Sequence, residues 1–260
     1  MSALSITGAP LVHVMTNSLS QNDCANLLLA VGARPIMAEA EEEAAEIAGR
    51  CRALVLNTGI PSAAKFAAMR LAGKAANQAG IPVVLDPVGI GASAFRREQI
   101  GRLLEEIRFT VIRGNSAEIA VLAGAERKFS GVDDAGGEAR EKEHLARLTA
   151  KKYSAILLQS GAKDILTDGE QVQTLSGGHP DMAKVTGAGC MLSALLGAFL
   201  GASPSDPWGA ARAAALFWKA CAQQAAARMV ARGEGTGSLR TYLIDAANLL
   251  ANEAEERYED

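Results

Sequence analysis

Short apolar segments recur along this chain and are separated by longer segments with helical patterning. They have the length of β-strands, end at polar or glycine residues, and occupy residues 11–15, 35–38, 53–57, 82–86, 109–113 and 154–159. Because they are apolar throughout rather than alternating, they predict strands buried on both faces, which the intervening helices make parallel. The pattern therefore predicts an α/β fold with a mainly parallel central sheet flanked by helices on both faces.

The segments between the strands carry helix-capping signals. Asn22 and Asp23 can cap a helix over residues 24–31 that Gly32 ends, and Ser62 can cap another helix. Further helices are expected over residues 41–50, 62–78, 118–122, 208–230 and 238–252. Strand and helix thus alternate through most of the chain.

Two later segments depart from this alternation. Residues 164–167 and 171–175 flank an Asp-Gly-Glu sequence, which is a hairpin signal and predicts an antiparallel edge to the sheet. Residues 128–138 contain three glycines and form a long loop candidate, which suits a lid and a solvated connector equally well. With no linker and no internal repeat in the sequence, we expect a single domain over residues 1–260.

Composition narrows the classes of function. The chain is 49% hydrophobic and only 4% aromatic, which favours helices packed on a sheet over an all-β sandwich. Its net charge is −3 and no basic block stands out, so we expect no nucleic-acid partner. The four cysteines form no Cys-x-x-Cys pair and indicate neither a disulfide framework nor a zinc site. Without a signal peptide or a long apolar span, we expect a cytoplasmic protein that does not enter membranes.

A glycine turn precedes the most apolar helical segment. The sequence KVTGAGC covers residues 184–190 and is followed by small and apolar side chains up to residue 200. Gly187 and Gly189 let the backbone approach a ligand, and the free N–H groups of a helix N-terminus attract anions. Cys190 falls in the first turn, where the helix dipole favours a thiolate. A purely structural turn before a core helix explains the same residues, so this stretch alone does not decide its role.

Polar residues follow the predicted strands at the point where each strand ends. They are Asn17, Asn57, Asp86, Arg113 and Ser160. In an open parallel sheet the ligand crevice lies beyond the carboxyl ends of the strands, so these residues are expected to converge at one edge. Taken alone, each of them has a strong structural explanation, as a helix cap or turn residue or, for Arg113, as one partner of a surface ion pair. Their recurrence favours a functional site.

The residue types at this edge suit phosphoryl transfer. Asp86 and Glu118 supply two carboxylates, the ligands that Mg²⁺ uses together with water and nucleotide phosphates. Arg113 can hold a phosphate oxygen by a forked contact. Phosphoryl transfer needs such positioned charges more than covalent chemistry of the protein. A P-loop motif is absent from the sequence, and the Gly187-x-Gly189 pair is only a weak match to a dinucleotide fingerprint because it lacks the last glycine.

Seven ordered motifs connect the chain with a known family. They are LVHVMTN (11–17), ARPIMA (33–38), LDPVGIGA (85–92), IRGNSAEI (112–119), GVD (131–133), KVTGAGC (184–190) and GTGS (235–238). With these motifs the chain resembles the hydroxyethylthiazole kinase family of the ribokinase-like superfamily. The resemblance implies a ribokinase-like fold and transfer of the γ-phosphate of ATP to the hydroxyl of 4-methyl-5-(2-hydroxyethyl)thiazole, a salvage step toward thiamine. It also implies a homotrimer with active sites between subunits.

The resemblance further implies a role for each site residue. By position, Met37 and Gly187 correspond to substrate contacts, and Asn17 lines the thiazole pocket. Arg113 and Ser160 correspond to ATP contacts, and Asp86 and Glu118 to the carboxylates that bind Mg²⁺. Cys190 stands in the position of the catalytic base. Ser160 stands where threonine is usual in the family and keeps its hydroxyl. His13 also matches the family, but its apolar strand favours a core histidine over a catalyst.

Two other functions remain open at this stage. One is a related ribokinase-like kinase that acts on another small heteroaromatic alcohol, such as a pyrimidine or pyridoxal alcohol. The other is a thiazole- or nucleotide-binding protein without catalysis.

Overall fold

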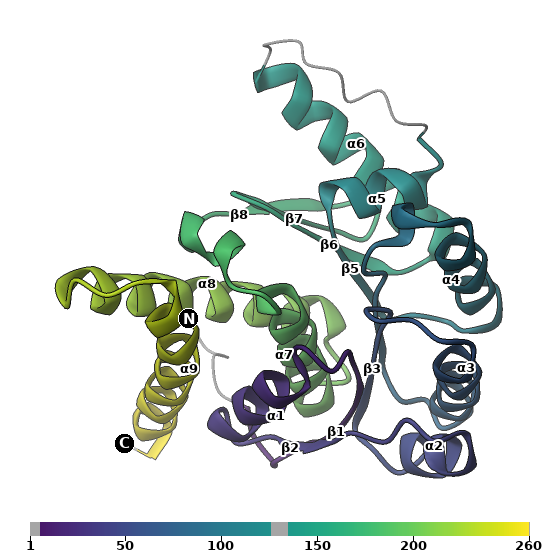
Figure 1. Cartoon of the computed structure of the whole chain (residues 1–260), viewed down its shortest axis with the longest axis horizontal. Coiled ribbons are helices and arrows are strands. Elements are labelled where there is room, and N and C mark those ends of the chain that lie inside the picture. The colour runs from purple at the N-terminus through teal and green to yellow at the C-terminus, as the bar shows by residue number, and fades with distance from the viewer. Residues whose placement is uncertain (1–5, 126–134, 260) are drawn as a thin grey trace.

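A central sheet organises the molecule (Figure 1). The computed structural model describes residues 6–125 and 135–259, and within them it forms an eight-stranded sheet of order β2-β1-β3-β4-β5-β6-β7-β8. The strands are β1 (Leu11–Met15), β2 (Arg34–Ile36), β3 (Ala53–Asn57), β4 (Val83–Asp86), β5 (Val111–Asn115), β6 (Ile156–Ser160), β7 (Asp164–Thr167) and β8 (Val172–Leu175). β1 to β6 are parallel, whereas β7 and β8 pair antiparallel. The predicted fold class, including the antiparallel edge hairpin, is confirmed.

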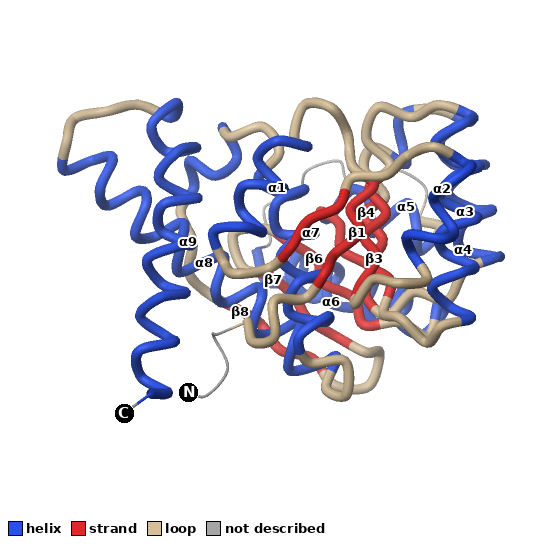
Figure 2. Tube along the Cα trace, turned by 90° about the horizontal axis from the view of Figure 1, so that it is seen from below, coloured by secondary structure: helices blue, strands red, loops and turns tan. Residues whose placement is uncertain are grey.

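Helices cover both faces of the sheet (Figure 2). One face carries α1 (Gln21–Ala30), α7 (Ala188–Ala202), α8 (Pro207–Ala231) and α9 (Thr236–Glu259). The other carries α2 (Glu41–Ala48), α3 (Ala63–Gln78), α4 (Ala94–Glu106), α5 (Ser116–Ala123) and α6 (Ala135–Tyr153). Short 3₁₀ helices follow β4 and β8, at η1 (Ile90–Ala92) and η2 (Pro180–Lys184). Within the described part of the chain, no helix combines the length and the apolar character that a membrane span requires.

Successive residues of each strand enter opposite cores, which explains the continuous apolar runs. In β3, Ala53 and Val55 belong to the core on the side of α1, α7, α8 and α9, whereas Leu54 and Leu56 belong to the core on the other face. All residues of β3 are buried. Period-2 alternation of side chains on a sheet covered on both faces leaves no position that needs to be polar. The polar residues are therefore left for the strand ends, where the candidate site lies.

Several predicted element boundaries are wrong by a few residues. Helix α1 begins at Gln21 after Ser20, so Asn22 and Asp23 do not cap it, and Asp23 instead pairs with Arg240 of α9. β5 and β6 begin two residues later than predicted and end at Asn115 and Ser160, which pair with each other in the sheet. The hydrogen bonds between strands join backbone groups, so an exposed strand end can carry polar side chains as readily as apolar ones. The apolar runs alone therefore did not locate the ends of β5 and β6.

Two helices were not predicted. They are α4 and α6, the second of which begins at Ala135 and includes Gly136 and Gly137. The predicted loop over residues 128–138 is therefore wrong from residue 135 onward, because the helix-forming residues that follow the glycines continue the helix. The rest of that loop, and with it the lid prediction, lies outside the described residues.

His13 is a core histidine on β1. Its side chain is fully buried, and Nε2 donates a hydrogen bond to the carbonyl oxygen of Ala38, 2.7 Å away. This bond anchors the loop after β2, on which Met37 lies. Burial lowers the pKa of His13 below its usual value of 6.5, although the bond to Ala38 opposes the change.

Protonation of His13 is expected to destabilise the fold in mild acid. Below pH 6.5 the unfolded chain takes up a proton on this imidazole while the folded chain does not, so stability falls by at most about 1.4 kcal/mol per pH unit until the folded pKa is reached. Urea unfolding at pH 7.5 and 5.5 measures this loss, which should be smaller in His13→Gln. His144→Gln, on an exposed histidine, is the control. An equal loss in His13→Gln and wild type would contradict the assignment.

Candidate active site

The glycine turn opens helix α7 as predicted. Gly187 has φ +85° and is the N-cap residue of the helix, a backbone conformation that residues with a Cβ rarely adopt. Cys190 lies in the first turn, and its side chain is partly buried. The first N–H groups of α7 therefore point out of the helix beside a thiol, at the positive end of the helix dipole.

A chain of hydrogen bonds runs from Cys190 to Asp86 across three strand ends. The amide nitrogen of Asn17, after β1, donates to the sulfur of Cys190 at 3.4 Å and to Oδ1 of Asn57 at 3.3 Å. Asn57, at the end of β3, donates in turn to Oδ2 of Asp86 at 2.8 Å. The thiol and the carboxylate are thus linked by two amides, and each amide is held by the parallel strand that precedes it.

Asp86 is the most deeply buried charged residue of this network. Its Oδ2 also accepts a 2.7 Å hydrogen bond from Ser193 Oγ and lies 3.5 Å from a guanidinium nitrogen of Arg113. Its Oδ1 is buried and has no hydrogen-bond partner among the described residues. A buried carboxylate oxygen without a partner is costly and calls for an ion or a ligand. Sequence reasoning missed Ser193, although its position three residues after Cys190 places both on one helix face.

Arg113 joins the network to the nucleotide side predicted from the sequence. Its guanidinium donates to Ser160 Oγ at 2.6 Å while it pairs with Asp86. It lies against the backbone of Gly189, because a Cβ built there would be 2.4 Å from a guanidinium nitrogen. Any side chain at position 189 would displace the arginine. Buried Nε of Arg113 has no hydrogen-bond partner in the described part of the chain.

Glu118 is held by backbone groups beside the network. It forms a capping box with Asn115, and its two oxygens accept hydrogen bonds from Gly89 N at 3.0 Å and Asn115 N at 2.8 Å. Burial raises the pKa of Glu118 and the charge of Asp86 raises it further, while the hydrogen bonds from Asn115 and Gly89 oppose this. The two carboxylates therefore repel each other across the site.

This carboxylate pair fits a magnesium ion. No cluster of three or more His, Cys, Asp or Glu side chains suited to a metal occurs in the described ranges. Mg²⁺ commonly binds one or two carboxylates together with water and substrate phosphates, so two are sufficient. The unpartnered Oδ1 of Asp86 and the repulsion between Asp86 and Glu118 are both relieved by a cation.

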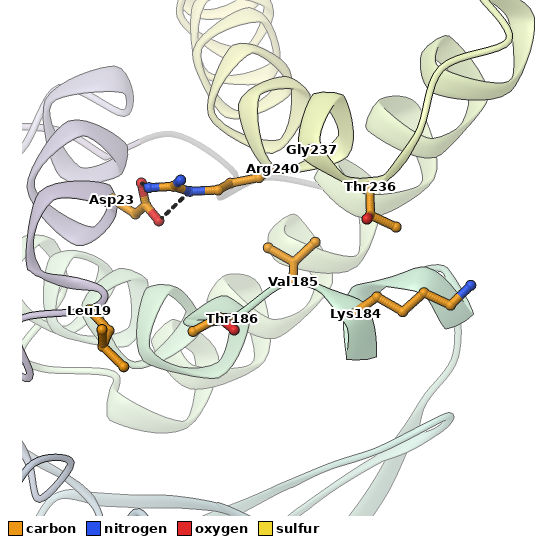
Figure 3. A pocket seen from close by; sticks show the side chains of 8 residues that line it. All are labelled: Leu19, Asp23, Lys184, Val185, Thr186, Thr236, Gly237 and Arg240. Carbon is orange, nitrogen blue, oxygen red and sulfur yellow. Dashed lines mark hydrogen bonds and ion pairs between the residues drawn. The ribbon is translucent and has the colours of Figure 1, made fainter.

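Met37 and Gly187 lie outside the hydrogen-bonded network. Met37 is partly buried on the loop after β2, where it packs against one core. Gly187 packs closely on Ser20 and adjoins a cavity of about 270 Å³. Figure 3 shows this cavity between the glycine turn and α9, with the residues that line it: Leu19, Asp23, Lys184, Val185, Thr186, Thr236, Gly237 and Arg240. The structure thus unites Asn17, Asp86, Arg113, Ser160 and Cys190, with Glu118 coupled to Asp86 by charge.

Known proteins resemble the chain in both sequence and structure. The profile of the Hydroxyethylthiazole kinase family matches residues 5–253. A hydroxyethylthiazole kinase from Methanosphaerula palustris is 44% identical over 92% of this chain and 88% of its own. The structure of a hydroxyethylthiazole kinase protein from Pyrococcus horikoshii OT3 superposes with a TM-score of 0.82, at 34% identity over 92% of this chain and 88% of that one.

A more distant structure extends the likeness of the fold. A ribokinase-like superfamily protein from Enterococcus faecalis V583 has a TM-score of 0.63 at 11% identity, covering 95% of this chain and 86% of its own. This likeness shows the fold alone, and the expected ribokinase-like fold is confirmed. The family profile over most of the length and the relatives at 44% and 34% identity leave one assignment: the chain belongs to the hydroxyethylthiazole kinase family.

Proposed function

We propose that this chain transfers the γ-phosphate of ATP to the hydroxyl of 4-methyl-5-(2-hydroxyethyl)thiazole and that the reaction depends on Mg²⁺. The observation that carries the proposal is the hydrogen-bonded path from Cys190 through Asn17 and Asn57 to Asp86, at the N-terminus of α7. It joins a proton acceptor for an alcohol to a carboxylate suited to a phosphate-bound cation. Family membership supports the choice of alcohol.

On the acceptor side, Cys190 takes the proton of the substrate hydroxyl. The amide of Asn17 donates to the sulfur and so fixes the direction of the side chain. Met37 and Gly187 contact the thiazole, and Asn17 lines the same pocket. A soft thiolate is a modest base for an alcohol, so positioning supplies most of the rate.

On the nucleotide side, Arg113 and Ser160 contact ATP. The buried Nε of Arg113, which has no partner among the described residues, supports a contact with a phosphate oxygen. The N–H groups at the start of α7 face the transferred phosphoryl group and stabilise its charge. The contact between Arg113 and Gly189 keeps the guanidinium beside those N–H groups.

Asp86 and Glu118 hold the magnesium ion. When bound, the ion neutralises charge on the phosphates of ATP and on the group in transfer. Asn57 and Ser193 donate to Oδ2 of Asp86, whereas Oδ1, without a partner among the described residues, is available to a cation. Gly89 and Asn115 fix Glu118 by one hydrogen bond to each of its oxygens.

We further propose that the whole of residues 1–260 acts as one kinase domain, in a cytoplasmic homotrimer whose active sites lie between subunits. Leu19 lines the cavity beside the glycine turn and is 67% exposed, which supports a subunit contact at this place. Small molecules are its partners, and the net charge of −3 supports the absence of nucleic acid among them.

A turnover assay tests the proposal. Purified protein, ATP and Mg²⁺ are mixed with the thiazole alcohol, a pyrimidine alcohol or pyridoxal, and ADP is measured with the phosphorylated product. We expect the thiazole alcohol to give the highest kcat/KM, and sedimentation of the same sample to give the mass of three chains. A higher kcat/KM for another alcohol would overturn the assignment of the thiazole alcohol as the substrate. Ligand binding without formation of ADP would indicate a protein that has lost catalysis.

A further inference from the structure

A buried lysine lies behind the acceptor side of the site. Lys65 is in the first turn of α3 and is 8% exposed. Its ammonium donates to the carbonyl oxygens of Thr16 and, at 3.4 Å, Gly59, and it lies 3.3 Å from Oε1 of Glu39. A buried ammonium is retained only where such partners replace its water.

The three partners of Lys65 come from three neighbouring strands. Thr16 follows β1, Glu39 follows β2 and Gly59 follows β3, and these strands are adjacent in the order β2-β1-β3. The loops at their carboxyl ends carry Asn17 and Met37. A single cation therefore connects the loops of Asn17 and Met37, two of the three residues expected to contact the alcohol.

Lys65 restrains Asn17 from two directions. Thr16 immediately precedes Asn17, so the bond to its carbonyl oxygen fixes the peptide that leads into Asn17. Gly59 packs against the side chain of Asn17, because a Cβ built on Gly59 would be 2.7 Å from Nδ2. That same Nδ2 donates to the sulfur of Cys190. The position of the amide at the sulfur thus depends on two backbone segments that Lys65 holds.

We propose that Lys65 is a positioning residue of the acceptor pocket, holding the loops after β1, β2 and β3 so that Asn17 and Met37 meet the alcohol beside Cys190. The inference rests on the proposed function, because it assigns Lys65 to the alcohol side of that site. The proposal predicts an effect on the alcohol and not on ATP. The expected nucleotide contacts Arg113 and Ser160 lie on β5 and β6, and Lys65 has no described bond to them.

The energetics favour positioning over a role in stability. Burial lowers the pKa of Lys65, and nearby Glu39 and Cys190 oppose this without reversing it. Below that pKa the folded chain holds a buried ammonium at a cost, which Lys65→Met removes. The same substitution takes a donor from the carbonyl oxygens of Thr16 and Gly59, so the two effects on stability oppose each other. Lys65→Met is therefore expected to unfold at a temperature close to that of wild type, and a loss of function in it would not reflect unfolding.

Steady-state kinetics of the full-length protein test the proposal. In Lys65→Met, KM for the thiazole alcohol is expected to rise about tenfold, while KM for ATP stays within about twofold of wild type. Glu39→Gln keeps both carbonyl bonds of Lys65 and removes only the ion pair on the Met37 side, so a smaller rise in the same KM is expected. Glu39 is exposed enough for Glu39→Gln to fold. If Lys65→Met does not fold, the KM of Glu39→Gln for the alcohol tests the proposal.

Two lysine controls make the result specific. Lys74 lies on α3 like Lys65 and forms an exposed ion pair with Glu106 of α4. Lys74→Met should change neither KM. Lys219→Met removes an equally buried lysine that pairs with Asp164, whose carboxylate accepts a hydrogen bond from Gly161 next to Ser160. This variant should leave the KM for the alcohol unchanged. Equal rises in both KM values of Lys65→Met, or an unchanged KM for the alcohol, would overturn the proposal. Absence of turnover by the wild-type protein would instead overturn the proposed function.

Discussion

Glu118→Gln is expected to lower Mg²⁺-dependent kcat by roughly 10–100-fold while binding of the thiazole alcohol changes little. Glutamine also serves in a capping box, so the bond from Asn115 and the start of α5 are retained. The negative charge that faces Asp86 is lost, and with it part of the attraction for the cation. Turnover at increasing Mg²⁺ and calorimetric binding of the alcohol measure the two effects separately.

The matched control for this variant is Glu105→Gln, on an exposed carboxylate of α4. It removes the same charge from the protein but at a distance from the site, and it should leave the Mg²⁺ dependence of kcat unchanged. Comparable losses of turnover and of alcohol binding in Glu118→Gln would argue against a metal role. In that case Glu118 would serve only to cap α5 and hold Gly89.

Cys190→Ala is expected to lower kcat by about 10-fold to 100-fold, with ATP affinity unchanged. General-base catalysis by a positioned side chain typically contributes more, about 10²–10⁴-fold, and a thiolate is a poor match for an alcohol. The remaining activity comes from the helix N-terminus, Arg113 and the carboxylates, which the substitution leaves in place. Single-turnover rates with saturating ATP measure the chemical step directly.

Cys221→Ala, at a buried thiol of α8, is the control for loss of a sulfur atom. It should reduce stability slightly but leave kcat near the wild-type value. An unchanged kcat in Cys190→Ala would reduce Cys190 to a packing residue at the start of α7. A loss of ATP affinity equal to the loss of kcat would assign it to nucleotide binding instead.

The strand pattern predicted most of the fold because each apolar run is forced by burial on both faces of the sheet. The convergence of Asn17, Asn57, Asp86, Arg113 and Ser160 also followed from the sequence, since parallel strands bring their carboxyl ends to one edge. The structure places these residues in contact. Their individual roles stay predictions until the variants are measured.

Contacts made by long side chains could not be predicted from the sequence. Lys65 looks like an ordinary surface residue of an amphipathic helix, and only the structure shows that its ammonium reaches back over the sheet edge. The ion pair of Asp23 with Arg240 joins residues far apart along the chain, which no local pattern reveals. Helix α6 was missed because two glycines at its start indicate a loop, whereas the residues after them favour a helix.

Helix α7 is buried around its whole circumference, with twelve of its fifteen residues buried. The part of the site proposed to handle phosphate is therefore built on an element that cannot move without disturbing the core. In the proposed site, Asn17 and Met37, which are expected to contact the alcohol, lie instead on the loops after β1 and β2. In evolution, a chain built this way can change the alcohol it accepts by altering those loops while its phosphate chemistry is inherited intact.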